Sequence, residues 1–172
     1  MVAQTARREV ILEPDAFDPK TFLGSKWSIS GGDNRNIGLS RIDLSLIQLN
    51  STLKKGEKSI DGRERHVRLL REGDILLGAR VFYELWQDHR NIPEEWCSEV
   101  GGKPRYISFD GSYLYGPPKV RFISRRVPVR YVLCLVFGSE AWGWCTRPID
   151  GPWQENQCAA VLPWNYKHLT DS

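Results

Sequence analysis

The stretch RYVLCLVFGSEAWGWCTR, residues 130–147, alternates large apolar side chains with small or polar ones on both sides of Ser139-Glu140. This alternation predicts two antiparallel strands joined by a two-residue loop. A two-residue loop at Ser139-Glu140 fixes the register of the two strands, in which Phe137 lies opposite Trp142, Leu135 opposite Trp144 and Cys134 opposite Cys145. On that register Leu133, Leu135, Phe137, Trp142 and Trp144 share one face. A slip by one residue would separate the tryptophans from the leucines, so we expect burial to enforce this pairing and Trp142 and Trp144 to be mainly core.

A second hairpin is predicted upstream, where Asp110-Gly111 separates two runs rich in aromatic and β-branched residues. The first run is Tyr106–Phe109 and the second is Ser112–Tyr115. An Asp-Gly pair between alternating apolar runs favours a tight turn, because both central positions of that turn need a positive φ.

Two helices are expected before these strands. Asp61 can cap a helix over Gly62–Glu72, which Gly73 ends and which we expect to be buried through Val67 and Leu70. A second helix is expected over Ala79–Asp88. Its buried stripe follows helical spacing and consists of Ala79, Phe82, Leu85 and Trp86.

The N-terminal part carries weaker signals. Residues 1–14 are expected to be flexible or to lie along the surface. Asp18 and Pro19 open a short helical turn that ends at Gly24, and residues 30–38 (SGGDNRNIG) lack an apolar period and are expected to form a loop. Residues 41–49 predict a strand with a bend near Leu46-Ile47.

Together these elements predict an α+β fold, with two main helices packed on a C-terminal antiparallel sheet of four or five strands. The 172 residues suit one domain, and we see no linker or repeat that would divide residues 1–172. With 41% hydrophobic and 26% charged residues, the composition is that of a globular protein.

The sequence also favours a cytoplasmic location. No apolar run approaches the roughly 20 residues of a membrane span, and the N-terminus has no apolar stretch typical of a secretory signal. None of the four cysteines lies in a C-x-x-C pair, so free thiols in a reducing compartment are expected. We expect no membrane partner.

Several scattered positions form a recognisable layout. Ile92-Pro93-Glu94-Glu95-Trp96 precedes Ile107-Ser108-Phe109-Asp110-Gly111, Tyr131-Val132-Leu133 and Trp142-Gly143-Trp144. Over residues 17–162 this layout resembles a group of small, uncharacterised bacterial proteins that share IPE-x-W, I-x-F-x-G and W-x-W motifs. The resemblance implies a bacterial single-domain protein, and it transfers no activity, cofactor or site. The basic segment 121–129 is longer than that group implies.

Signatures of catalysis and of metal binding are missing. The sequence has no H-E-x-x-H, G-x-S-x-G, phosphate-binding loop or G-x-G-x-x-G motif, so we assign no catalytic residue, metal or cofactor. His89 with Cys97 is the one nucleophile–base couple that we consider, yet Asp88-His89-Arg90 is also typical of a polar helix end. Glu94 and Glu95 suit the first turn of a helix.

Charge is distributed unevenly along the chain. Residues 103–130 hold seven cationic residues and one anionic residue, a net charge of +6 in a chain whose total is +3. A basic sheet interleaved with aromatic rings can bind single-stranded nucleic acid, although a solvated charged face gives the same composition. The nucleic-acid hypothesis assigns the contacts to Lys119, Arg121, Arg125, Arg126 and Arg130.

The seven tryptophans support a different hypothesis. An exposed tryptophan flanked by arginine is typical of protein interfaces, whereas tryptophans that fill the core would have no such role. We therefore expect a non-enzymatic binding protein, first for another protein and alternatively for nucleic acid, with an enzyme of unknown class third.

Overall fold

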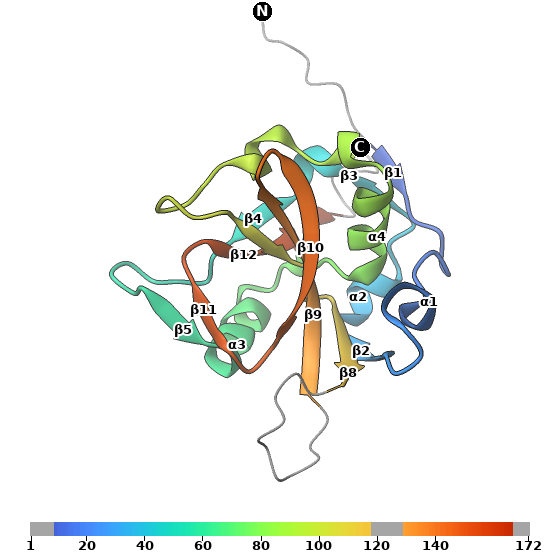
Figure 1. Cartoon of the computed structure of the whole chain (residues 1–172), viewed down its shortest axis with the longest axis horizontal. Helices are drawn as coiled ribbons and strands as arrows, with labels where there is room; N and C mark the ends of the chain where they lie inside the picture. Colours follow the sequence, from blue (N-terminus) through green and yellow to red (C-terminus); the bar gives the residue numbers. More distant parts are fainter. Residues whose placement is uncertain (1–8, 118–128, 167–172) are drawn as a thin grey trace, which may run out of the picture.

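The computed structural model describes residues 9–117 and 129–166. Four α-helices lie in these ranges: α1 (Pro19–Leu23), α2 (Asn34–Ile37), α3 (Gly62–Glu72) and α4 (Ala79–Gln87). The strands are β1 (Glu9–Ile11), β2 (Ser28–Gly32), β3 (Arg41–Asp43), β4 (Gln48–Asn50), β5 (Ser59–Asp61), β6 (Ile75–Leu76), β7 (Tyr106–Ser108), β8 (Ser112–Gly116), β9 (Val129–Gly138), β10 (Ala141–Pro148), β11 (Pro152–Gln154) and β12 (Gln157–Leu162). Figure 1 shows their arrangement.

The predicted architecture of two main helices on a C-terminal antiparallel sheet of four or five strands is wrong. The main sheet has eight strands from both halves of the chain, in the order β2-β8-β9-β7-β12-β4, with β10 beside β9 and β6 beside β12. The sheet is mixed because β12 runs parallel to β7. Two smaller sheets pair β1 with β3 and β11 with β5. Apolar alternation identifies a strand without identifying its partner, so the long-range pairings were not readable from the sequence.

The hairpin of β9 and β10 is confirmed in its register. Phe137 pairs with Trp142, Leu135 with Trp144 and Cys134 with Cys145. The loop residues Ser139 and Glu140 have φ values of 51° and 67°. Two successive positive φ angles are typical of a type I′ turn, whose twist matches that of the flanking strands. Local sequence therefore determines this part of the sheet.

The predicted hairpin at Asp110-Gly111 is wrong. Strands β7 and β8 do not pair with each other, and both pair with β9, at Val136–Cys134 and at Tyr131–Val129 respectively. The Gly111 backbone is bonded elsewhere, since its N–H donates to the Leu77 carbonyl at 2.8 Å. A Cβ on Gly111 would lie 2.1 Å from the Leu76 carbonyl oxygen. This glycine serves a close approach of two backbones and not a tight turn.

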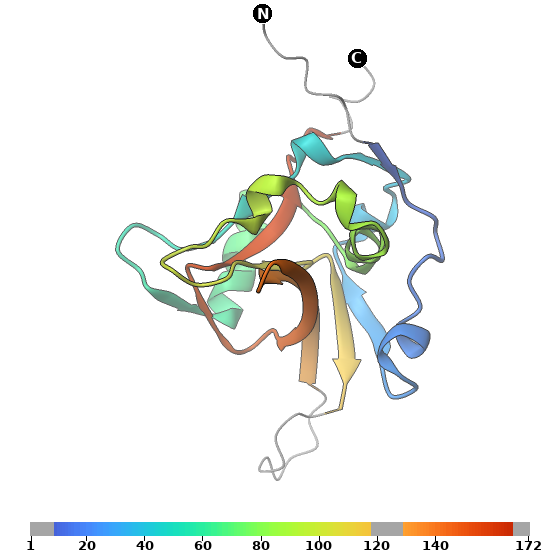
Figure 2. The ribbon, with the colours of Figure 1, turned by 45° about the horizontal axis from the view of Figure 1, so that its top comes forward.

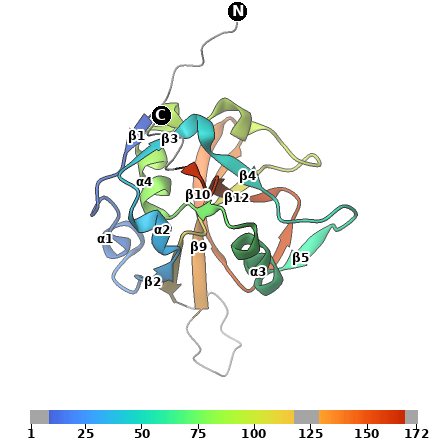
Figure 3. The same ribbon diagram turned by 180° about the vertical axis from the view of Figure 1, so that it is seen from behind.

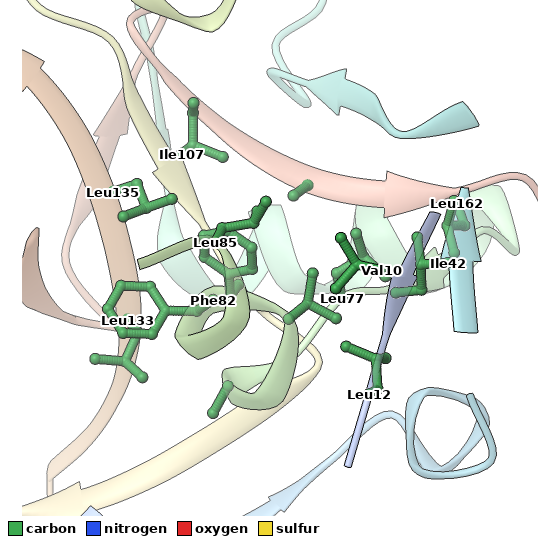
Figure 4. Packing of buried hydrophobic residues seen from close by; sticks show 14 of the residues in the cluster. Val10, Leu12, Ile42, Leu77, Phe82, Leu85, Ile107, Leu133, Leu135 and Leu162 are labelled. Carbon is green, nitrogen blue, oxygen red and sulfur yellow. The ribbon is translucent and has the colours of Figure 1, made fainter. Parts of the chain in front are cut away.

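Helix α4 covers one face of the sheet, as its sequence predicts. Ala79, Phe82 and Leu85 are buried, and Trp86 is partly buried against the same core. In Figure 4, Phe82 and Leu85 extend toward Leu133 and Leu135 of β9. The i, i+3 spacing of these side chains gives α4 a continuous apolar stripe.

Helix α3 has the predicted bounds and caps but buries a different face. Asp61 accepts a hydrogen bond from the Arg63 N–H, and Gly73 ends the helix in the left-handed conformation. Val67 and Leu70, predicted to be buried, are 39% and 52% exposed. Arg65 and Leu69 are buried instead. Figure 3 shows α3 next to β5, well separated from α4.

Arg65 turns inward because its charge is neutralised inside. Its Nη1 and Nη2 donate to the two carboxylate oxygens of Asp110 at 2.5 and 2.9 Å, and Nη2 also donates to Ser108 Oγ at 2.8 Å. The guanidinium lies 3.8 Å from the centre of the Trp153 ring. Burial opposes ionisation of Asp110, but Arg65 and the Ser108 hydroxyl outweigh it and lower the pKa of that carboxyl. An ion pair therefore decides which face of α3 is buried.

Four predictions for the N-terminal part meet different outcomes. Helix α1 begins at Pro19 with Asp18 as its cap, as expected. The described part of residues 1–14 does not fray, because β1 pairs with β3 and both Val10 and Leu12 are buried. Residues 30–38 are not a simple loop, since they complete β2 and form α2. The bend in residues 41–49 is a 3₁₀ turn over Leu44–Leu46.

The tryptophans divide into three groups. Trp96 and Trp153 are fully buried, whereas Trp27, Trp86 and Trp142 are partly buried at the edge of the main core. Trp144 is 36% exposed, so the expectation that it is mainly core is wrong, although its ring packs on Phe22 with centroids 4.8 Å apart. Trp164 is 71% exposed. Tryptophan therefore serves both the interior and the surface of this protein.

Candidate functional site

An apolar depression lies beside β2, and we call it the β2 groove. Its cavity volume is about 260 Å³. The groove is lined by Pro14, Phe17, Ile29, Gly31, Gly32, Asn34, Asn36, Ile37, Ala79, Arg80, Gly111 and Ser112. These residues come from the segment between β1 and α1, from β2 and α2, and from the start of α4, the segment between β7 and β8 and the start of β8, so the groove exists only in the folded chain.

Glycines allow three backbones to meet at the floor of the groove. Gly32 has a φ of +155°, and a Cβ there would lie 2.1 Å from the Gly111 carbonyl oxygen. A Cβ on Gly78 would lie 2.4 Å from both Asn36 Nδ2 and Ser112 Oγ. Side chains at these positions would push β2, α4 and the β7–β8 segment apart, so the floor requires glycine.

The first N–H groups of α4 are satisfied by side chains from the groove. The Gly78 N–H donates to Asn36 Oδ1 and the Ala79 N–H donates to Ser112 Oγ, each at 3.0 Å. Gly78 has no side chain that could cap the helix, so Asn36 and Ser112 supply the cap. These two bonds tie the start of α4 to α2 and β8.

Arg80 holds α2 in place at the rim. Its Nη2 donates to the carbonyl oxygens of Asn36, Ile37 and Leu39 at 2.8, 2.9 and 3.1 Å. Asn36 and Ile37 are the last residues of α2 and Leu39 follows it, so these bonds join Arg80 to the C-terminal end of α2. The bonds fix the backbone that carries Ile37, whose side chain is 69% exposed.

Asp33 ties the same segment to the core. Its carboxylate accepts from Arg35 Nη2 at 2.8 Å and from the Leu76 N–H at 3.0 Å. Burial opposes its ionisation, but the hydrogen bonds from Arg35 and Leu76 outweigh burial and lower the pKa of Asp33. The groove wall is thus anchored by charged groups, while its surface is apolar.

The outer edge of β2 adds hydrogen-bonding capacity to the groove. Strand β2 ends the order of the main sheet and pairs with β8 on one side, and no other strand within the described ranges pairs with it. In Figure 2, β2 lies beside β8 at the margin of the sheet. Every residue of β2 is exposed except Ser30, and Ile29 is 53% exposed. An unpaired strand edge carries backbone donors and acceptors that another strand can use.

The sequence hypotheses placed the function elsewhere. Lys119, Arg121, Arg125 and Arg126 lie outside the described residues, so their arrangement is untested. Arg130, the remaining member of that set, is exposed at the start of β9. Its guanidinium lies 5.7 Å from the centre of the Tyr113 ring, within the range of a cation–π contact.

The candidate nucleophile lacks the environment that it would need. Burial, followed by Glu94 and Glu95, raises the pKa of the Cys97 thiol, whereas a reactive cysteine needs a lowered pKa. The His89 ring packs on Trp86, with centroids 4.7 Å apart. The four cysteines form no disulfide, and the thiol of Cys134 is buried beside Cys145.

Among the described residues, no group of three or more His, Cys, Asp or Glu side chains could hold a metal ion. No helix within the same ranges is long and apolar enough to cross a membrane.

Sequence reasoning missed the β2 groove because five of its residues, Gly31, Gly32, Asn34, Asn36 and Ile37, lie in the segment 30–38 assigned to a loop. The available signal was the pair Gly31-Gly32 together with Gly78 and Gly111, since isolated glycines next to strands often mark close backbone approach. Their convergence, however, depends on pairings between distant segments.

Comparisons with known protein families, curated proteins and solved structures found no match to this chain. The resemblance to a group of small bacterial proteins therefore stays a prediction. The geometry of the chain alone has to support any functional proposal.

Proposed function

We propose that this chain is a non-enzymatic binding protein that recognises an extended segment of another protein by strand addition at β2. The observation that carries the proposal is an exposed, unpaired strand edge directly beside an apolar groove. In this mode of recognition the backbone of the strand gives affinity, and a neighbouring pocket selects alternate side chains of the peptide.

The composition of β2 supports this use. Exposed edges are commonly blocked by lysine, proline or other charged residues, and β2 (Ser-Ile-Ser-Gly-Gly) contains none of them. Its one irregularity is a shift of register between Ile29 and Gly31, on the side that faces β8. Ile29 and Ile37 supply apolar contact on the rim of the groove.

The experiment selects peptides from a random display library against the purified chain and measures their affinity by fluorescence anisotropy. We expect selected peptides to carry apolar residues at every second position, because alternate side chains of an added strand face the groove. We expect Ile29→Lys to weaken binding by about tenfold or more, since a lysine at a strand edge opposes pairing and removes an apolar contact.

Leu70→Lys is the matched control. Leu70 is 52% exposed on α3, close to the 53% of Ile29, and lies outside the groove. Equal losses in the two variants would contradict strand addition at β2, and so would selected peptides without an alternating pattern.

We also propose that the protein acts in the cytoplasm. Cysteines without disulfides are typical of reducing compartments, and Cys97, Cys134, Cys145 and Cys158 form no disulfide.

Nucleic-acid binding through Lys119, Arg121, Arg125, Arg126 and Arg130 is a second candidate function. It is supported by the net charge of residues 103–130 and by the contact of the Arg130 guanidinium with the Tyr113 ring. Such a site would neutralise phosphates with its cations while bases stack on aromatic rings.

Salt dependence tests the second candidate. Affinity for single-stranded oligonucleotides should fall steeply between low and moderate salt, because phosphate contacts release counterions. Charge reversal at Arg121 and Arg125 should abolish binding. Absence of binding to single- and double-stranded oligonucleotides at low salt would exclude this function.

A further inference from the structure

A second cavity lies on the side of the sheet opposite α4, and we call it the Arg147 pocket. Its volume is about 370 Å³, within the range of small-molecule sites. Lys103, Tyr106, Arg147 and Asn156 contribute the groups that matter for recognition. They come from β7, from β10 and from the loops that precede β7 and β12.

The pocket carries two positive charges that no carboxylate of the described residues neutralises. Neither Lys103 nor Arg147 forms an ion pair with a carboxylate in residues 9–117 and 129–166. Lys103 Nζ donates to Gln154 Oε1 at 3.3 Å. Arg147 Nε is buried and has no hydrogen-bond partner among the same residues. Two unpaired cations at one cavity favour an anionic ligand, and guanidinium suits phosphate in particular.

Aromatic rings hold the arginine at the pocket. Its guanidinium carbon lies 5.6 Å from the centre of the Tyr106 ring and 5.3 Å from that of Trp153. Tyr106 is itself partly exposed and lines the pocket, whereas Trp153 is buried. A planar ligand can therefore lie against an aromatic face next to the cations.

Asn156 adds an unused acceptor. The residue is 4% exposed, and its Nδ2 donates to the Pro104 carbonyl at 2.8 Å, which fixes the orientation of the amide. Its Oδ1 is buried without a partner in the described part of the chain. Buried acceptors are normally satisfied, so this oxygen marks a position for a ligand N–H group.

We propose that the Arg147 pocket binds a small phosphorylated nucleoside. The phosphate lies at Lys103 and Arg147, the base lies against Tyr106, and an N–H group of the base donates to Asn156 Oδ1. This site does not involve β2, so a test of nucleotide binding is independent of the proposed peptide recognition.

Isothermal titration calorimetry of the full chain with AMP tests the proposal. Adenosine lacks the phosphate, ribose 5-phosphate lacks the base, and purine riboside 5′-monophosphate lacks the amino group. We expect each of these three probes to bind more weakly than AMP. Equal affinity for AMP and ribose 5-phosphate would overturn the proposal, as would no binding of AMP at millimolar concentration.

Variants locate the binding. Arg147→Gln should weaken AMP binding by at least about tenfold, the loss expected for charge-assisted hydrogen bonds. Lys103→Gln should weaken it less, and because Lys103 is exposed this variant tests the pocket even if Arg147→Gln fails to fold. Arg41→Gln is the matched control, since Arg41 lies on β3 with a side chain that is 61% exposed.

Two outcomes would distinguish binding at this pocket from non-specific attraction to positive charge. An equal loss in Arg41→Gln and Lys103→Gln would contradict a defined pocket. Binding of oligonucleotides without any binding of mononucleotides would also overturn the proposal and would favour the extended basic surface instead.

Discussion

Helices α3 and α4 have similar lengths, and each packs against the main sheet, yet they bury their faces for different reasons. Helix α4 buries Phe82 and Leu85 at helical spacing, as an amphipathic helix should. Helix α3 buries Arg65 and leaves Val67 and Leu70 largely exposed. The apolar pattern thus predicts the orientation of one helix and fails for the other.

The difference follows from the partner that each helix meets. Phe82 and Leu85 face an apolar face of the sheet, with Leu133 and Leu135. Arg65 meets the carboxylate of Asp110, which is 2% exposed and has no other described cation within ion-pair distance. An unpaired buried carboxylate costs more free energy than the exposure of two aliphatic side chains, so the ion pair decides the orientation of α3.

The largest effect should come from breaking this ion pair. Asp110→Ala leaves Arg65 buried without its counter-charge, and we expect a loss of about 3–5 kcal/mol in the free energy of unfolding. Urea denaturation measures it. Asp88→Ala is the control, because Asp88 accepts from Arg90 Nε at 2.8 Å in a similar bidentate pair that lies at the surface. An equally small change in both variants would show that Asp110 does not orient α3.

The same ion pair should make stability sensitive to acid. The pKa of Asp110 is lowered from 3.8 in the folded chain, so its contribution is present above that pH and is lost as the pH falls toward the lowered pKa. We expect this component of the acid dependence to be missing in Asp110→Ala, with unfolding followed by urea at several pH values.

Truncation of leucines should sharpen the contrast between the helices. Leu85→Ala on α4 removes a fully buried side chain and should cost about 2–5 kcal/mol. Leu70→Ala on α3 should change stability by no more than about 0.5 kcal/mol, because Leu70 is half exposed. Comparable losses in urea denaturation would mean that α3 buries Leu70 after all.

The smallest effect concerns His66, the neighbour of Arg65. Its Nδ1 lies 2.9 Å from the Tyr113 hydroxyl. Burial lowers the pKa of His66 from 6.5, and the attraction of Asp110 opposes this without cancelling it. The unfolded chain therefore takes up the proton first, so stability is retained above pH 6.5 and falls as the pH drops below it. We expect His66→Gln to flatten the stability profile in this range, and an unchanged slope would contradict the assignment.

The candidate sites show the same contrast between what local sequence predicts and what tertiary contacts decide. The nucleic-acid contacts Lys119, Arg121, Arg125, Arg126 and Arg130 were predicted from composition, and of these only Arg130 lies within the described residues. The β2 groove and the Arg147 pocket were not predicted. Asn156 and Arg147 are unremarkable in sequence, and they become notable only because folding buries Asn156 Oδ1 and Arg147 Nε without a hydrogen-bond partner among the described residues.

By itself the sequence determined the features that depend on neighbouring residues. These are the caps of α1 and α3, the apolar stripe of α4, and the register of the β9–β10 hairpin, which a two-residue loop and adjacent apolar alternation specify. Tertiary structure decided the eight-strand order, the inward turn of Arg65 and the role of Gly111. Each of these depends on a partner from a distant segment, and burial, charge neutralisation and close backbone approach select that partner only once the chain has folded.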